Sequence, residues 1–225
     1  MSNQDLAGLE GSLRRRFRVV ETTVVVGGRR VDILHPASAE DLIDEADFAL
    51  DERLPYWAEL WPSARVLAER LLQQEGAGRT LIELGCGSGL VATCASLSGF
   101  EVVVSDYYED ATRFARVNAW RNHAPVPNAL VLDWRALPPA TKRYDVVIAS
   151  DVLYERAYGN LVAQAIAALL GPDAVALLAD PGRVGRDEFL RGLPGLGLVV
   201  RRRDEIPFVE GPIRQTITVF EIAWA

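Results

Sequence analysis

The sequence predicts an α/β fold in which helices cover both faces of a mostly parallel sheet. The chain has 225 residues, a length that suits one domain with a sizeable core. Along its middle, short runs of β-branched and apolar residues alternate with segments in which apolar residues are spaced three and four apart. Strands separated by such helices form βαβ units, whose strands run parallel and whose helices pack on the sheet.

The elements of the alternating region follow from this spacing. The predicted strands are short apolar runs bounded by turn residues, and they are residues 80–84, 101–105, 129–132, 144–150 and 174–179. The predicted helices carry apolar residues along one side, and they are a segment from residue 64 to the glycines at 76–78, then residues 90–98, 110–122 and 157–170.

The N-terminal part of the chain predicts a β-hairpin. Residues 19–26 are a β-branched run, Gly27 and Gly28 supply a turn, and residues 31–34 resume the run. Residues 35–54 contain a proline and scattered acids, which indicates an irregular arm with room for one helical turn. We therefore expect residues 1–54 to pack as a hairpin and arm on a main domain of residues 55–225.

The C-terminal end predicts an antiparallel addition to the sheet. Residues 197–203 and 216–223 have strand character, and the loop between them contains proline and glycine without a clear helix. Two strands joined without a crossover helix run antiparallel. With the five strands before them they make a seven-stranded sheet with an antiparallel last strand.

Composition limits the classes of function. The 24 Lys and Arg against 31 Asp and Glu give a formal net charge of −7, which disfavours a nucleic-acid substrate. Cys86 and Cys94 do not suggest a disulfide framework, and no apolar run is long enough to span a bilayer, so we expect a cytoplasmic protein without a membrane partner. His35 and His123 lie far apart and away from any cysteine at ligand spacing, so we expect no metal site.

The most informative segment is an apolar strand that runs into a glycine loop containing Gly85, Gly87 and Gly89. In a doubly wound sheet the carboxyl end of the first strand is the expected ligand position, and glycines let the backbone approach a ligand closely. The third glycine comes one position too early for the dinucleotide fingerprint G-x-G-x-x-G. Glu83 would repel a pyrophosphate but suits the ammonium and sulfonium of S-adenosylmethionine.

Two further positions complete a nucleoside pocket. Asp106 ends the next strand, 21 residues after Gly85, where a carboxylate can accept hydrogen bonds from ribose hydroxyls. Asp133 and Trp134 follow the third strand and offer an acceptor and a π-face for adenine. Taken singly, Asp106 could be a turn acid and Trp134 could be ordinary packing. We interpret Cys86 as a small loop residue, since methyl transfer needs no enzyme nucleophile.

These motifs resemble those of known methyltransferases. The run E-L-G-C-G-S-G at 83–89 with Asp106, and R-V-N-A-W-R-N at 116–122, resemble the seven-strand, Rossmann-like class I methyltransferases. The runs P-Y-W-A-E-L-W-P-S at 55–63 and D-V-L-Y at 151–154 resemble the D-x-x-Y protein lysine methyltransferases. A-D-P-G-R at 179–183 and R-Q-T at 214–216 are most similar to the lysine methyltransferases of the electron-transfer flavoprotein β-subunit.

The resemblance implies S-adenosylmethionine as cofactor and a role for each matching residue. It places Trp61 beside the methionine moiety, Asp106 and Tyr107 at the ribose, and Trp134 at adenine. It places Glu83, Gly85 and Gly87 at the amino-acid end, with Cys86, Gly89 and Asp133 in the same pocket and Ser150 at its floor.

The D-x-x-Y residues would line the acceptor side and carry the catalysis. Asp151 would orient the acceptor amine or relay its proton, and Tyr154 would narrow the channel and hydrogen-bond the same nitrogen. Either Trp57 or Trp61 could offer a π-face to the incoming cation. The alternatives are purely structural roles, in which Asp151 caps a helix after the fourth strand and Tyr154 only packs against its neighbours.

Several functions remain open at this point. The first is methylation of a lysine in a protein substrate, and the second is methylation of a small-molecule amine, since bacterial members of such groups are also described as nicotinamide N-methyltransferase-like. A catalytically silent cofactor-binding module conflicts with the presence of Glu83, Asp106 and Asp151. An NAD-dependent oxidoreductase conflicts with the displaced third glycine. The acceptor, the number of methyl groups and the oligomeric state stay undetermined.

Overall fold

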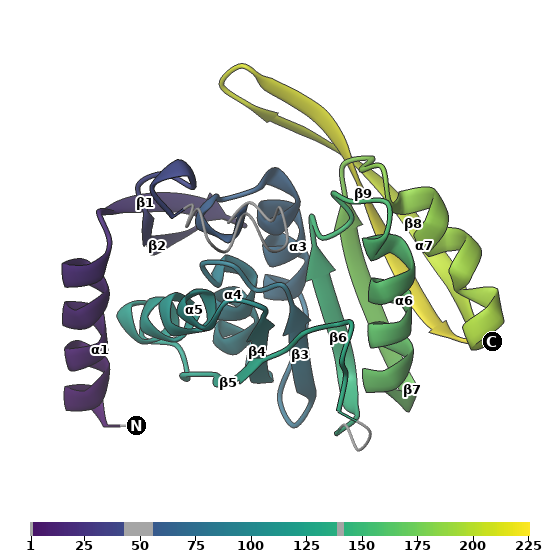
Figure 1. Cartoon of the computed structure of the whole chain (residues 1–225), viewed down its shortest axis with the longest axis horizontal. Coiled ribbons are helices and arrows are strands. Elements are labelled where there is room, and N and C mark those ends of the chain that lie inside the picture. The colour runs from purple at the N-terminus through teal and green to yellow at the C-terminus, as the bar shows by residue number, and fades with distance from the viewer. Residues whose placement is uncertain (1, 43–55, 139–141) are drawn as a thin grey trace.

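The computed structural model describes residues 2–42, 56–138 and 142–225. Its centre is a seven-stranded sheet in the order β5-β4-β3-β6-β7-β9-β8 (Figure 1). The strands are β3 Thr80–Leu84, β4 Glu101–Asp106, β5 Asn128–Val131, β6 Tyr144–Ser150, β7 Leu170–Asp180, β8 Leu198–Glu210 and β9 Ile213–Trp224. The first five of these run parallel, whereas β9 pairs antiparallel with both β7 and β8. This confirms the predicted sheet.

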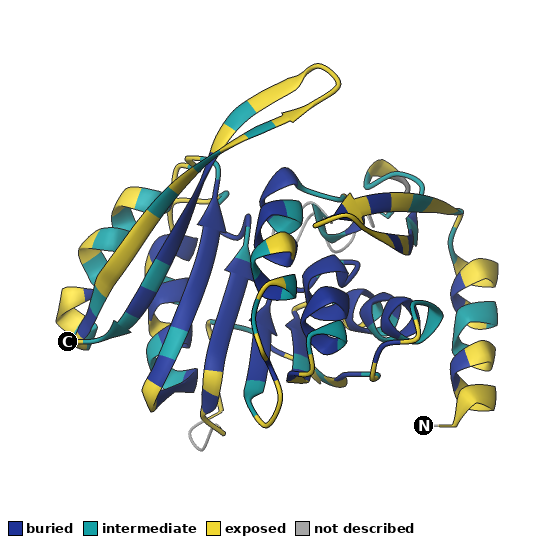
Figure 2. Cartoon of the chain, turned by 180° about the vertical axis from the view of Figure 1, so that it is seen from behind, coloured by how far each residue is buried: buried dark blue, intermediate teal, exposed yellow. Residues whose placement is uncertain are grey.

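Helices cover both faces of the sheet, as the alternating pattern predicts. The helices are α3 Pro62–Leu72, α4 Leu90–Leu97, α5 Glu109–Arg121, α6 Tyr158–Leu169 and α7 Arg186–Gly192. Side chains of α3 and α4 share one buried cluster with Leu81, while side chains of α6 and α7 share another with Ile82. Successive residues of a strand face opposite sides, so adjacent residues of β3 serve the two cores. The central strands are buried along most of their length (Figure 2).

The order of the strands fixes where a ligand can bind. The chain steps outward from β3 through β4 to β5 and then returns to β6, which pairs with β3 on its other side. Loops that leave β3 and β6 at their carboxyl ends therefore diverge to opposite faces and leave a crevice between them.

The predicted N-terminal hairpin is confirmed, with β1 at Val19–Val26 and β2 at Arg29–Pro36. It packs on α5 through Asn118, whose side chain accepts from the Leu34 N–H at 2.8 Å and donates to the Leu34 carbonyl at 2.7 Å. The predicted arm continues as the short 3-10 helix Glu40–Leu42, and the rest of the arm, at 43–54, lies outside the described residues.

A helix at the start of the chain, α1 at Asn3–Arg16, was not predicted. The Ser2 side chain accepts from the backbone N–H of Asp5, and the Asp5 carboxylate accepts from that of Ser2, which forms a capping box. Leu6 and Leu13 are its buried residues, and basic residues end it. Two ion pairs tie α1 to α5, Arg16 to Asp110 at 2.7 Å and Arg121 to Glu10 at 2.5 Å.

The C-terminal strands are longer than predicted. Residues 204–215, expected to form mostly a loop, are paired as a ladder up to Glu210 and Ile213. Pro207 lies within β8, which is the edge strand of the sheet, where the missing N–H of a proline is tolerated. The helix α7 between β7 and β8 was also not predicted, and Phe189 is its buried residue. No helix within 2–42, 56–138 or 142–225 is long and apolar enough to cross a membrane.

Candidate active site

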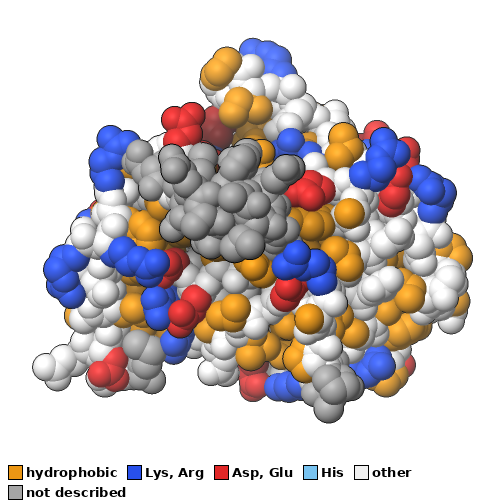
Figure 3. All heavy atoms as spheres, viewed as in Figure 1, with side chains coloured by type: hydrophobic (Ala, Val, Ile, Leu, Met, Phe, Trp, Pro, Cys, Tyr) orange, Lys and Arg blue, Asp and Glu red, His pale blue; other side chains and the backbone are white. Residues whose placement is uncertain are grey.

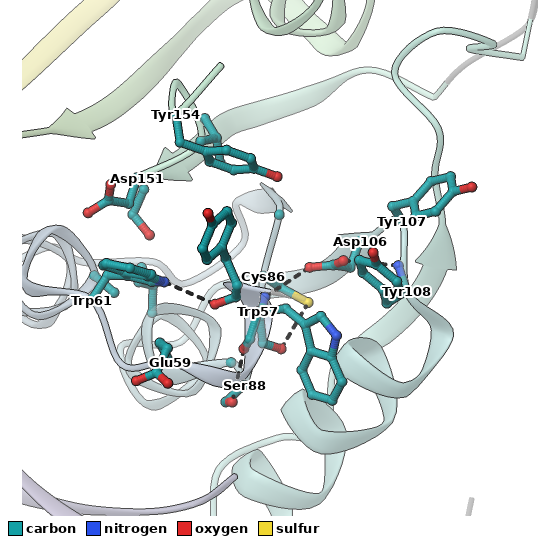
Figure 4. Close-up of a pocket in the computed structure, with 18 of the residues that line it drawn as sticks. Trp57, Glu59, Trp61, Cys86, Ser88, Asp106, Tyr107, Tyr108, Asp151 and Tyr154 are labelled. Atoms are coloured by element: carbon teal, nitrogen blue, oxygen red, sulfur yellow. Dashed lines mark hydrogen bonds between the residues drawn. The ribbon is translucent and has the colours of Figure 1, made fainter. Parts of the chain in front are cut away.

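A cavity opens at the carboxyl ends of the central strands, and the space within it, including the part open to solvent, is about 970 Å³. It is lined by every predicted site residue except Glu83, namely Trp61, Gly85, Cys86, Gly87, Gly89, Asp106, Tyr107, Asp133, Trp134, Ser150, Asp151 and Tyr154. In Figure 4, Asp151, Tyr154 and Trp61 lie on one side and Asp106, Tyr107 and Tyr108 on the other. The residues predicted to line the acceptor side and those predicted to bind the nucleoside therefore face the same cavity.

The glycine loop after β3 requires glycine by conformation and by space. Gly85, Gly87 and Gly89 have φ of 66°, 49° and 80°, a region that disfavours side chains. A Cβ at Gly85 would lie 3.0 Å from Val152 Cγ1, and one at Gly87 would lie 3.0 Å from the Trp57 carbonyl oxygen. A Cβ at Gly89 would collide with Ala115 on α5. The loop therefore brings bare backbone to the cavity wall.

Asp106, at the end of β4, is held in place from behind. The Gly87 N–H donates to Oδ2 at 3.0 Å, and the Tyr108 N–H donates to Oδ1 at 3.0 Å. Burial raises the pKa of the Asp106 carboxyl to about 6, although these backbone donors oppose the rise. Each carboxylate oxygen has two lone pairs, so both oxygens can still accept a bond from the cavity side.

Glu83 is not brought to the cavity with the others. It is 1% exposed on the α4 side of β3, where the Ala92 N–H bonds its carboxylate. Its Oε2 has no hydrogen-bond partner among the residues described. Burial raises the pKa of this carboxyl well above its usual value, which favours its uncharged form behind the loop.

The structure shows the surroundings of three cofactor-side residues, Asp133, Trp134 and Cys86, which the sequence does not reveal. Both oxygens of Asp133 are held by Arg135, at 2.9 Å from the backbone N–H and 2.8 Å from Nη2. The Trp134 ring lies near Gly85, and its buried Nε1 has no hydrogen-bond partner in the structure described. Burial raises the pKa of the Cys86 thiol well above its usual value, which agrees with a neutral loop residue rather than a nucleophile.

Aromatic rings form a continuous wall around the cavity. Trp61, Tyr56, Tyr154, Tyr158 and Trp134 follow one another edge to face, with successive ring centroids 6.1, 5.2, 5.1 and 5.9 Å apart. Sequence reasoning missed Tyr56 and Tyr158 as cavity residues. Tyr56 stands in the motif at 55–63, but Tyr158 begins α6 and gave no signal of its own.

Asp151 directly follows β6, in a conformation unusual for a side-chain-bearing residue, with φ of 59°. Its carboxylate accepts from Ser63 Oγ at 2.9 Å and from Arg183 Nε at 2.5 Å. Burial raises the pKa of this carboxyl, and the Arg183 guanidinium opposes the rise. The helix-cap alternative is wrong, because α6 starts at Tyr158 and its N-cap is Ala157. Ser63 and Arg183 lie in quoted motifs, but sequence alone assigned them no partner.

The cavity fits S-adenosylmethionine by the chemistry of its lining. Bare backbone at Gly85 and Gly87 leaves room for the amino-acid end, and Asp106 presents open lone pairs for a diol. The orphaned Nε1 of Trp134 and the neighbouring aromatic ring suit a flat base. No group of three or more His, Cys, Asp and Glu side chains that could hold a metal occurs in the described part of the chain.

Two curated relatives are lysine methyltransferases. The electron transfer flavoprotein beta subunit lysine methyltransferase of Danio rerio is 33% identical over 134 residues, covering 57% of this chain and 51% of that protein. Protein N-lysine methyltransferase METTL21A of Xenopus tropicalis is 31% identical over 139 residues, covering 58% of this chain and 63% of that protein. This chain therefore spans only part of each relative.

Structural and family comparisons agree with the fold. Magnesium protoporphyrin IX methyltransferase from Synechocystis PCC 6803, solved with bound SAH, aligns with a TM-score of 0.56 at 19% identity, covering 72% of this chain and 81% of that one. The family model described as a methyltransferase domain matches residues 56–205, the stretch that holds every residue of the cavity. The chain belongs to this methyltransferase domain family.

Proposed function

We propose that the protein is an S-adenosylmethionine-dependent N-methyltransferase that methylates a lysine side chain of a protein substrate. The observation that carries the proposal is the shared cavity, in which Asp151 and Tyr154 face the same space as the glycine loop and Asp106. The names of the two lysine methyltransferase relatives support the same acceptor. A cytoplasmic location fits a chain whose two cysteines are free.

The cofactor would be held by the loops that follow β3, β4 and β5. When bound, S-adenosylmethionine supplies a methyl group on a sulfonium, which makes its carbon electrophilic. The backbone of Gly85 and Gly87 would approach the amino-acid end, Asp106 would accept from the ribose, and Trp134 would lie against adenine. The remaining contacts proposed for the same pocket are Trp61, Cys86, Gly89, Tyr107, Asp133 and Ser150.

The residues on the acceptor side would align the amine. A lysine amine has a usual pKa of about 10.4 and must lose its proton before its lone pair can attack. As the nitrogen–carbon bond forms, the carbon–sulfur bond breaks and its electron pair stays on sulfur, so the rate depends on alignment and exclusion of water. Asp151 would orient the nitrogen. Burial raises the pKa of the Tyr154 hydroxyl, so this group stays protonated and can hydrogen-bond the same nitrogen.

The identity of the acceptor can be tested without interference from self-methylation on lysine, because Lys142 is the only lysine in the sequence. The Lys142→Arg variant therefore removes self-methylation on a lysine side chain. This variant is incubated with methyl-labelled S-adenosylmethionine and a cell extract, and label in protein is separated from label in small molecules. We expect label on lysines of a protein other than the enzyme, located by peptide mass spectrometry.

Two outcomes would contradict the proposal. Label confined to the small-molecule fraction would favour a small amine as acceptor, for which an enclosed aromatic pocket is suited. Absence of label despite binding of the cofactor would favour a silent module. The Lys142→Arg change itself is remote from the cavity, since Lys142 lies over the Tyr144 ring at the start of β6.

A further inference from the structure

The carboxylate of Asp151 is the centre of a network that joins three parts of the chain, namely the start of α3, the loop after β6 and the loop after β7. Ser63, near the start of α3, donates to one oxygen, and Arg183, in the loop after β7, donates to the other. The Arg183 guanidinium carbon also lies 5.0 Å from the centroid of the Trp61 ring. One arginine therefore contacts both a proposed acceptor-side residue and a proposed cofactor-side residue.

Arg183 is itself fixed by its loop. Its backbone N–H approaches both oxygens of Asp180 at 3.3 Å, and Asp180 is fully buried at the end of β7. A second arginine, Arg186, donates to Asp180 at 2.6 Å and compensates its charge. The Arg183 side chain is 33% exposed and that of Asp151 only 3%, so the guanidinium reaches the carboxylate from the solvent side.

Two carboxylates next to the acceptor side are each paired with an arginine. Asp151 is paired with Arg183, and Asp180 with Arg186. The other titratable and charged residues that line the cavity are Glu59, which is exposed, Cys86, Asp106, Asp133, Arg135, Tyr56, Tyr107, Tyr108, Tyr154 and Tyr158. An ammonium that approached Asp151 would meet a carboxylate already neutralised by a fixed cation. An uncharged amine would not be repelled by that cation.

We propose that Arg183 is a positioning residue that holds the Asp151 carboxylate and makes the acceptor site select the neutral form of the lysine amine. The inference rests on the proposed function, because it concerns how a lysine amine enters the site. Only the neutral form has the lone pair that attacks, so a site that selects it keeps the bound acceptor reactive. Loss of Arg183 leaves Asp151 uncompensated, and Asp151 then favours the unreactive ammonium.

The test uses n-butylamine as a mimic of the lysine side chain and the full-length protein loaded with S-adenosylhomocysteine, which cannot donate a methyl group. The variants are Arg183→Gln, which removes the charge, and Arg183→Lys, which keeps it. Arg156→Gln is the matched control, because Arg156 pairs with Glu188 at 3.0 Å on the exposed surface. The Kd of the amine is measured by NMR titration between about pH 7 and about pH 9.5, below the usual amine pKa of about 10.4.

For the wild-type protein and Arg156→Gln, we expect Kd to fall about tenfold for each pH unit, because the neutral fraction of the amine rises by that factor. Arg183→Lys should follow the same dependence. For Arg183→Gln, we expect Kd at about pH 7 to be lower by at least about threefold and nearly independent of pH, since an uncompensated carboxylate binds the ammonium. Methyl transfer by Arg183→Gln should be slower although the amine binds more tightly, a combination that loss of structure does not produce.

The inference is overturned if Arg183→Gln and the wild-type protein show the same Kd and the same pH dependence. It falls together with the proposed function if the wild-type protein binds no amine at any pH. If Arg183→Gln does not fold, Asp151→Asn gives the opposite test, because it leaves the Arg183 charge in excess. That variant should bind the amine at least about threefold more weakly with the wild-type slope, and an unchanged Kd would overturn the inference.

Discussion

Replacing Asp106 with asparagine changes one group that the proposed cofactor site needs and leaves its shape almost unchanged. The carboxylate now accepts the Gly87 N–H at 3.0 Å and the Tyr108 N–H at 3.0 Å, with lone pairs left over for a ribose. Asparagine has one acceptor oxygen and one amino group. The amino group must face either a backbone N–H or a ribose hydroxyl. The substitution also removes the negative charge that strengthens every hydrogen bond to this side chain.

The magnitude follows from the hydrogen bonds lost. A bond to a charged acceptor contributes about 1.5–3 kcal/mol and a bond to a neutral acceptor about 1 kcal/mol, so weakening two of them in this way costs roughly 1–4 kcal/mol. Each 1.4 kcal/mol is a factor of ten, so Kd for S-adenosylhomocysteine should rise roughly 5-fold to 700-fold. Isothermal titration calorimetry of the purified variant measures this directly.

The matched control is Asp145→Asn. Asp145 also accepts from a backbone N–H, that of Thr80 at 2.8 Å, but it lies at the amino end of β6, away from the cavity. It should leave Kd unchanged. If Asp106→Asn binds the ligand within about threefold of the wild-type protein, less than the loss of one such bond, the assignment of Asp106 to the ribose is refuted.

Two further perturbations test the same account. Because burial holds the pKa of Asp106 at about 6, affinity for S-adenosylhomocysteine should be constant above that pH and fall as pH drops through it, when the carboxylate gains a proton. The Asp106→Asn variant should show no such fall in affinity. An equal fall in that variant would refute the attribution to Asp106. Asn118→Ala leaves the Leu34 N–H and carbonyl and the Ser88 carbonyl without their partner in a fully buried site, so the free energy of unfolding should fall by about 2–4 kcal/mol in urea. Asn122→Ala removes the same pair of bonds to the exposed Asp32 and should cost less, and the reverse order would contradict the burial argument.

The alternating core of the fold could be predicted because local signals and tertiary structure agree there. The strand at 80–84 leads directly into the glycine loop, and Gly89 at the end of that loop is also the N-cap of the following helix. The expected strand at 174–179 in fact extends over Leu170–Asp180. Its first residues have no apolar run of their own, and Gly171 and Pro172 gave a turn signal.

The missed elements depend on contacts that a local pattern does not contain. The helix α1 includes Gly8 and Gly11, which lower its intrinsic helix propensity, and it is held through Leu6, Leu13 and its ion pairs to α5. The extra length of β8 and β9 comes from cross-strand pairing around the Gly211–Pro212 turn, whereas the same residues in isolation indicate a loop.

The sequence motifs located some residues of the site and failed to locate others. Motif positions were sufficient to bring the glycine loop, Asp106 and Asp151 to one cavity, because the carboxyl ends of neighbouring parallel strands meet at one edge. They were not sufficient for Glu83, whose side chain points to the opposite side of the loop because of strand alternation. Nor could they reveal that Arg183 holds Asp151, since that contact joins residues 32 apart across two loops.

The most direct test of the central claim is the rate of methyl transfer by Asp151→Asn to the lysine substrate identified by labelling, measured beside its affinity for S-adenosylhomocysteine. A group that orients the acceptor amine or takes up its proton increases the rate of transfer by about 100-fold or more. The account predicts a fall of that size with unchanged affinity for the cofactor product. Full turnover by the variant, with the same affinity, would contradict it.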